Sequence, residues 1–226
     1  MTCNPQQTRS RREFLKVSAA VGAVGLAQLS HHSHVHAQET NLLKIGLIGC
    51  GGRGSGAAVQ ALAADPQTKL IAMADAFEDQ AQKSLAAIKK SANSEQVDVP
   101  PERIFTGFDG YQQVIDSDVD IVLLACTPHF RPKHLRAAIE AGKHVFAEKP
   151  VAVDPVGVRS VLETTTMAHE KGLSIVSGLC WRYETNTLEL MRRLHDGAIG
   201  QIIAGRGYSL RGQLWYREPT EEWSEM

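Results

Sequence analysis

A glycine-rich turn near the start of the apolar part of the sequence constrains the fold more than any other feature. Residues 49–54 read Gly-Cys-Gly-Gly-Arg-Gly and match the pattern G-x-G-x-x-G. The turn follows a predicted strand, Ile45–Ile48, and opens a predicted alanine-rich helix, Ser55–Ala64. In this context the glycines allow a tight turn, a close backbone approach to a pyrophosphate and close packing of helix on strand. Free N–H groups at the start of the helix would face the anion, so the turn predicts a dinucleotide-binding strand–turn–helix unit.

An acidic residue at the end of the next predicted strand supports this interpretation. Asp75 follows the strand Lys69–Ala74 and lies 21 positions after Gly54. A carboxylate there accepts hydrogen bonds from an adenosine ribose and repels a 2′-phosphate. The sequence therefore favours NAD, while the nearby cation Arg53 keeps NADP as the alternative cofactor. The competing interpretation is a glycine turn that serves packing alone, with Asp75 as an incidental acid.

Strand-like and helical segments continue to alternate along the chain, which predicts an α/β fold with a Rossmann-type, doubly wound parallel sheet. The further strands are predicted at Val119–Cys126, His144–Ala147, Leu173–Leu179 and Gln201–Leu210. The further helices are predicted at Phe77–Lys90, Arg131–Ala141 (with Gly142 ending it), from an N-cap at Asp154 to about Lys171, and at Thr187–His195. Polar residues and two prolines make Ser91–Arg103 a predicted loop, and Trp215–Met226 carries no clear end signal.

The N-terminal 37 residues have the pattern of an export signal. Arg11 and Arg12 precede a weakly apolar run, Val17–Leu29, and small residues surround a cleavage point after Ala37. The run is about 13 residues long, too short to span a bilayer as a helix. The segment resembles a twin-arginine (Tat) signal, which predicts a periplasmic or other extracytoplasmic protein. The alternative is a disordered basic tail. We interpret the histidines of residues 31–36 as part of the discarded spacer rather than as a metal site.

Charge and cysteine content exclude several classes of function. The chain has 24 basic and 25 acidic residues, and removing residues 1–37 leaves a net charge of −4. Such a balance does not support a nucleic-acid partner or a membrane-surface protein, and no stable membrane span is expected after signal removal. The four cysteines have no metal-ligand spacing, so no metal site is predicted. Cys50 has no evident base beside it and is not expected to be a catalytic thiol.

Two further motifs stand where predicted strands end. They are Ala125-Cys126-Thr127-Pro128 and Ala147-Glu148-Lys149-Pro150. Together with the glycine turn, they make the chain from Leu43 onward resemble the Gfo/Idh/MocA family of nicotinamide-dependent oxidoreductases. Glu148–Pro150 is the most specific element of this resemblance, because the glycine turn is shared with many other families.

The resemblance implies a set of site residues. The pyrophosphate would be held by Gly49, Gly51, Gly52, Arg53 and Gly54, and the adenosine ribose by Asp75. Beside the nicotinamide ribose it implies Thr127, Pro128, Glu148 and, in the helix below, His134. Lys149 would be the catalytic residue, reaching the carboxamide and the reacting hydroxyl or carbonyl, and Arg182 would lie near cofactor and substrate. Taken alone, Lys149 also fits an ordinary surface lysine before a proline turn, and His129 fits an exposed loop histidine as well as a cofactor contact. His144, His169 and His195 are interpreted as structural.

The family pattern has a second part that this sequence does not complete. Members carry an open-faced α+β domain that binds substrate, mediates oligomers and supplies a further aspartate and histidine. No counterpart of that pair follows here. We therefore expect a signal at 1–37, a NAD(P)-binding Rossmann domain at 43–180 and the start of an incomplete α+β substrate domain at 181–226. A homo-oligomer is expected if that domain is complete. If it is not, we expect poor dinucleotide binding or aggregation, unless a partner covers the exposed strand edge.

The resulting functional hypothesis is an exported NAD(P)-dependent oxidoreductase that acts on a sugar or cyclitol alcohol by hydride transfer. Hydride chemistry belongs to the nicotinamide, so the protein supplies orientation and a proton path. Two alternatives stay open: a NAD-dependent glycosidase of the same fold, and a non-catalytic nucleotide-binding remnant.

Overall fold

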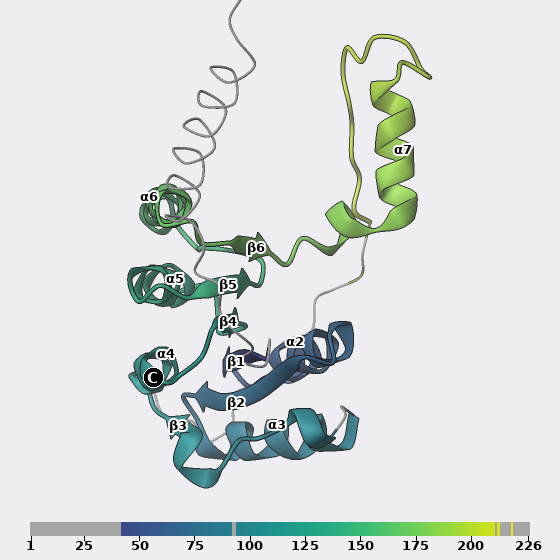
Figure 1. Cartoon of the computed structure of the whole chain (residues 1–226). Coiled ribbons are helices and arrows are strands. Elements are labelled where there is room, and N and C mark those ends of the chain that lie inside the picture. Colours follow the sequence, from purple (N-terminus) through teal and green to yellow (C-terminus); the bar gives the residue numbers. More distant parts are fainter. Residues whose placement is uncertain (1–41, 92–93, 211, 213–217, 219–226) are drawn as a thin grey trace, which may run out of the picture. The chain divides into compact units, whose positions relative to one another are not determined.

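The computed structural model describes residues 42–91, 94–210, 212 and 218 (Figure 1). The predicted signal lies outside these residues. The chain divides into two compact units, with the boundary between Ala125 and Cys126. Six strands form a sheet of order β3-β2-β1-β4-β5-β6, which is the strand order of the doubly wound dinucleotide-binding fold. The predicted Rossmann-type fold is therefore confirmed.

The first unit contains four strands that pair in parallel. They are β1 (Leu43–Ile48), β2 (Thr68–Asp75), β3 (Ile104–Thr106) and β4 (Ile121–Leu124). Its helices are α2 (Gly52–Ala64), α3 (Glu78–Ser91) and α4 (Gly110–Asp116), with short 3₁₀ turns at Ser94–Gln96 and Pro101–Arg103. The β1 residue Ile45 aligns with Leu70 of β2 and with Ile121 of β4.

The core of the first unit is built from the apolar strands and the inner faces of the helices. Leu47, Leu70 and Met73 are fully buried, as are Ile88 of α3 and Val114 of α4. Strands with nearly continuous apolar sequence are typical of a parallel sheet that is covered on both faces. This packing fixes the carboxyl ends of β1 and β2, where the glycine turn and Asp75 lie.

The second unit contains β5 (His144–Ala147) and β6 (Ile175–Ser177), which pair in parallel. Its helices are α5 (Arg131–Glu140), α6 (Pro155–Glu170) and α7 (Thr185–His195), with a 3₁₀ turn at Cys180–Tyr183. Asp154 caps α6 as predicted, because its Oδ1 accepts a hydrogen bond from the Gly157 N–H at 2.6 Å. The predicted helix end at Gly142 is also confirmed, since this residue adopts a left-handed φ of 77°.

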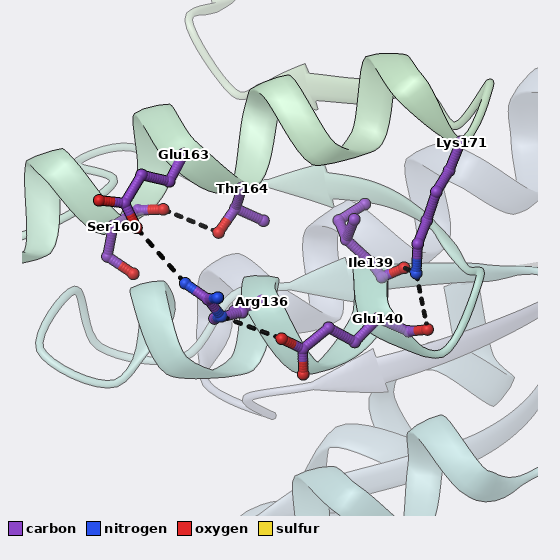
Figure 2. Close-up of polar contacts among 7 residues, drawn as sticks. All are labelled: Arg136, Ile139, Glu140, Ser160, Glu163, Thr164 and Lys171. Atoms are coloured by element: carbon purple, nitrogen blue, oxygen red, sulfur yellow. Dashed lines mark hydrogen bonds and ion pairs between the residues drawn. The ribbon is translucent and has the colours of Figure 1, made fainter.

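Polar contacts join α5 to α6 within the second unit (Figure 2). The Lys171 ammonium, just after α6, donates to the carbonyl oxygens of Ile139 and Glu140 at 3.0 and 2.9 Å. These carbonyls belong to the last turn of α5, beyond the reach of the regular i→i−4 donors. The Ile139 oxygen also accepts a hydrogen bond from the Gly142 N–H at 3.1 Å. Arg136 adds exposed ion pairs to Glu140 at 3.0 Å and to Glu163 of α6 at 3.5 Å. The positive charge of Lys171 at the C-terminus of α5 also interacts favourably with the negative end of that helix dipole.

Several predicted elements need correction. The strand predicted at Gln201–Leu210 is wrong: residues 202–210 form neither helix nor strand and are exposed, because no described segment pairs with them and a lone strand leaves its backbone groups unpaired. The loop predicted at Ser91–Arg103 contains two 3₁₀ turns and a bridge from Val97 to Leu70. The strand predicted at Leu173–Leu179 is limited to β6. No element was predicted at β3 or α4.

Candidate functional site

The glycine turn between β1 and α2 has a geometry that requires glycine. Gly49 has a φ of 96°, which L side chains rarely adopt. A Cβ atom on Gly54 would lie 1.9 Å from the Gly49 carbonyl oxygen, a severe overlap. The turn is held by a hydrogen bond from the Gly49 N–H to the Ala74 oxygen at 2.8 Å. The first and last glycines of the motif therefore pack directly on one another and bring the start of α2 against the end of β1.

The N-terminus of α2 is open on the side of the turn. Gly51, the N-cap residue, provides no side-chain cap, and Cβ atoms built on Gly51 or Gly52 would meet nothing within 4 Å. Both residues are exposed. Backbone N–H groups at such a helix end attract anions, because they are unsatisfied and lie at the positive end of the dipole. Arg53 is exposed beside them and donates to Gln60 Oε1 at 3.2 Å.

Asp75 is tied to this turn. Its Oδ2 accepts a hydrogen bond from the Cys50 N–H at 2.6 Å, and its Oδ1 accepts one from the Phe77 N–H at 3.1 Å. The structure therefore brings the glycine turn and the predicted acidic partner together. The Cys50 thiol is buried and lies 3.3 Å from the Ala74 oxygen. Burial, and secondarily the Asp75 charge, raises the pKa of Cys50 to about 12, which supports the prediction that it is not a nucleophile.

In the second unit, Glu148, Lys149 and Pro150 follow β5 directly. Glu148 is buried, with 4% of its surface exposed, and its Oε2 accepts a hydrogen bond from the Lys149 N–H at 3.2 Å. The Lys149 side chain is exposed, and the Lys149–Pro150 peptide is cis. Gly178, after β6, lies against the carboxylate, since a Cβ there would be 2.8 Å from the Glu148 Cδ and both oxygens. Gly178 is thus a site residue that sequence reasoning missed.

Arg131, the first residue of α5, is a second residue that sequence reasoning missed. Only 2% of its surface is exposed. Its guanidinium donates through Nη1 to the Pro150 carbonyl and through Nη2 to the Cys126 carbonyl. Its Nε has no hydrogen-bond partner among the described residues. Burial lowers the pKa of Arg131, and the nearby Cys126 and Glu148 act in the opposite direction.

His134 lies one turn further along α5 and is buried. Its Nδ1 is 3.4 Å from the Cys126 Sγ, and its ring stacks on Phe130 with centroids 6.0 Å apart. Burial, followed by the charges of Lys133 and Arg131, lowers the pKa of His134 to about 4. The imidazole is therefore neutral at physiological pH, and its contacts are with the loop after β4.

Of the remaining predicted residues, Thr127 and Pro128 lie in the loop after β4, and Arg182 lies elsewhere. Thr127 is exposed and Pro128 half-buried, and the Thr127 oxygen accepts a hydrogen bond from the Phe130 N–H at 3.2 Å. Arg182 is exposed in the 3₁₀ turn after β6. Within the described part of the second unit, no hydrogen bond or ion pair joins its side chain to Glu148 or Lys149. No cluster of His, Cys, Asp and Glu side chains suited to a metal ion occurs among the described residues.

A search of protein-family models matches residues 43–178 to one family, described as an oxidoreductase family with an NAD-binding Rossmann fold and labelled Gfo/Idh/MocA. The match spans more than half of the chain and includes the glycine turn, Asp75 and the motif after β5. None of the helices in the described part is both long and apolar enough to cross a membrane.

Known proteins similar to this chain include enzymes of two kinds. A glycosyl hydrolase family 109 protein of Streptomyces coelicolor is 27% identical over 73% of this chain and 33% of its own length. Inositol 2-dehydrogenase 4 of Saccharopolyspora erythraea is 30% identical over 71% of this chain and 43% of its own length. The crystal structure of scyllo-inositol dehydrogenase from Lactobacillus casei, with bound NAD(H) and scyllo-inositol, matches with a TM-score of 0.56 at 22% identity. That match covers 70% of this chain and 42% of the other, and shows likeness of fold. The chain therefore spans less than half the length of each of these proteins.

Proposed function

The chain belongs to the Gfo/Idh/MocA family of oxidoreductases with an NAD-binding Rossmann fold, and from this premise we propose that it binds NAD and transfers hydride between this cofactor and a sugar or cyclitol alcohol. The observation that carries the proposal is the geometry of the glycine turn. Gly54 packs against the Gly49 carbonyl oxygen, where any Cβ would overlap with it, and this close approach brings an uncapped helix N-terminus to the end of β1.

The residues of the first unit fit a dinucleotide. The open backbone at Gly51 and Gly52 admits a pyrophosphate, and the N–H groups of α2 attract its charge. The Asp75 carboxylate lies at the end of β2, where such folds hold the adenosine ribose. Each Asp75 carboxylate oxygen accepts one backbone N–H group. Since a carboxylate oxygen can accept more than one hydrogen bond, both can also accept bonds from ribose hydroxyl groups.

The motif after β5 supplies the proton chemistry of the proposed reaction. The bound dinucleotide supplies the hydride acceptor when an alcohol is oxidised. Lys149 holds the substrate hydroxyl and takes up its proton, so that a ketone remains after the C–H hydride has left. Glu148 is the buried acid that orients the Lys149 backbone through the 3.2 Å hydrogen bond. The substrate class is supported by the inositol dehydrogenase among the relatives.

Titration calorimetry with NAD, NADP and ADP-ribose tests this proposal. NAD is expected to bind at least about 10-fold more tightly than NADP, because the Asp75 carboxylate repels the 2′-phosphate. Asp75→Asn keeps an oxygen that can accept the Cys50 N–H but removes the charge. This variant should therefore reduce the ratio between the dissociation constants of NADP and NAD without unfolding the turn. Absence of binding by all three ligands would refute the cofactor assignment.

A second candidate is a NAD-dependent glycosidase, which the family 109 relative favours. Such an enzyme oxidises a sugar transiently, eliminates the aglycone and reduces the product again. The two activities differ in cofactor balance. Oxidation of a free sugar or cyclitol with stoichiometric formation of NADH supports the dehydrogenase. Release of nitrophenol from a nitrophenyl glycoside with no net change in NAD supports the glycosidase.

We further propose export by the twin-arginine route, on the sequence pattern around Arg11 and Arg12. That machinery carries folded proteins, so the cofactor would be bound before export. Fractionation of cells that express the wild type and an Arg11→Lys/Arg12→Lys variant tests this proposal. The wild type should appear in the periplasmic fraction and the variant should stay in the cytoplasm. Equal distribution of both would refute it.

A further inference from the structure

Arg131 is a buried charged side chain at the start of α5, and it has no direct role in the proposed reaction. We propose that Arg131 is a positioning residue, which fixes the Glu148–Lys149–Pro150 turn and with it the Lys149 side chain. This inference rests on the proposed function for the role of Lys149. Its structural half, the tie between Arg131 and the turn, does not depend on any cofactor.

The guanidinium joins two loops that are distant in sequence. Nη1 donates to the Pro150 carbonyl, directly after Lys149, and Nη2 donates to the Cys126 carbonyl after β4. Two donors on a planar, rigid group fix both carbonyls relative to one another. Lysine replaces this contact only in part: an ammonium can donate to two carbonyls, as that of Lys171 does, but it lacks the fixed planar fork of the guanidinium.

Because this contact is buried, its loss should cost more free energy than the loss of a hydrogen bond at the surface. Arg131 is 2% exposed and Glu148 is 4% exposed, and Glu148 is among the groups that favour the charged form of Arg131. Loss of the guanidinium would remove a hydrogen-bond donor from two carbonyl oxygens. It would also remove the positive charge beside the buried Glu148 carboxylate, and burial limits how far water can replace either. The Glu148 carboxylate is confined on another side by Gly178. The turn therefore has buried constraints on both flanks, while the Lys149 side chain extends from it into solvent.

A matched control is available on the same helix. Arg136 is half-exposed and makes ion pairs only at the surface of α5 and α6 (Figure 2). We would compare Arg131→Met and Arg131→Lys with Arg136→Met and Arg136→Lys. The first measurement is amide hydrogen exchange, read by mass spectrometry, in peptides that cover residues 144–154 of the protein without cofactor.

Arg131→Met should raise exchange after β5 by about 10-fold, and Arg131→Lys should raise it less, because it keeps the charge but loses the fork. The Arg136 variants should match the wild type there. If Arg131→Met does not fold, Arg131→Lys carries the comparison. Wild-type exchange in a folded Arg131→Lys or Arg131→Met protein would overturn the proposal.

The second measurement separates positioning from general stability. The dissociation constants of NAD and ADP-ribose are compared, since the two ligands differ by the nicotinamide. Arg131→Met should weaken NAD binding by about 10-fold and leave ADP-ribose within about 2-fold of the wild type. Equal weakening of both ligands would overturn the positioning role. If the wild type binds neither ligand, the proposed function fails, and the exchange experiment still decides whether Arg131 holds the turn.

Discussion

Burial of the His134 imidazole predicts a specific loss of stability when the pH falls below neutrality. The pKa of His134 is lowered from 6.5 to about 4, chiefly because the ring is buried in α5 beside Cys126 and Phe130. As the pH falls, the unfolded chain therefore binds a proton before the folded protein does. The stabilisation is complete above pH 6.5 and is lost progressively between pH 6.5 and pH 4.

The size of the effect follows from the displacement of the pKa. One pKa unit corresponds to about 1.4 kcal/mol, so the free energy of unfolding should fall by about 2 kcal/mol between pH 7 and pH 5. The loss should approach about 3 kcal/mol at pH 4. These figures apply to a ring that is almost entirely shielded, with 6% of its surface exposed.

Urea unfolding followed by circular dichroism at pH 7, 6 and 5 measures the effect. His134→Gln removes the titrating group and keeps an amide that can contact Cys126. Between pH 7 and pH 5 the free energy of unfolding should decrease for both proteins. The decrease for His134→Gln should be smaller than that of the wild type by about 2 kcal/mol. His169→Gln is the control, because His169 is exposed on α6, and its curve should follow the wild type. Parallel curves for the wild type and His134→Gln would refute the reasoning.

Four substitutions, one of them a control, test other parts of the structure. Gly54→Ala places a methyl group on a carbonyl oxygen of the turn and should weaken NAD binding at least about 100-fold by calorimetry. Gly56→Ala meets no atom closer than 3.5 Å and should instead stabilise α2 by about 0.5–1 kcal/mol in urea unfolding; equal effects of the two would contradict the overlap. Lys171→Met removes one ammonium and its two hydrogen bonds to the last turn of α5, and it should cost about 1 kcal/mol in the same assay. An unchanged unfolding midpoint would show that the contact is not stabilising. Gly178→Ala should displace the Glu148 carboxylate, which a crystal structure of the variant would reveal, and an unmoved carboxylate would disprove the contact.

Long periodic elements of this fold were predictable from the sequence, while short ones were not. The alternation of apolar strands and amphipathic helices predicted α2, α3, α5 and α6 closely, and Asp154 marked the start of α6 correctly. The strand β3 has only three residues, Ile104–Thr106, and none of them is fully buried. A run that short shows no alternation to recognise. The opposite error occurred at Gln201–Leu210, where strand-like residues have no described partner to pair with.

The candidate site divides in the same way between local and tertiary information. The glycine turn could be predicted, because its chemistry lies in consecutive residues. Asp75 could be proposed as its partner from spacing, but the direct hydrogen bond to the Cys50 N–H requires the approach of two strands. Gly178 gives no local signal, since its importance comes only from the carboxylate that packs against it. The assignment of Arg182 to the site remains a prediction from resemblance.

Arg131 is an intermediate case that sequence reasoning could have reached. The buried residues of α5 are Arg131, His134, Leu135, Ala138 and Ile139, which follow the helical spacing i, i+3, i+4, i+7 and i+8. An arginine at the first position of that stripe contradicts the apolar pattern, and a buried guanidinium is stable only with acceptors arranged around it. Such a conflict between residue type and position is expected where a side chain serves the site rather than the core. The same rule would draw attention to His134, which occupies the next position of the stripe. We therefore expect the loop after β4 and the turn after β5 to lose their order together when Arg131 is replaced, and exchange of the amides after Cys126 should rise in parallel with those after Glu148.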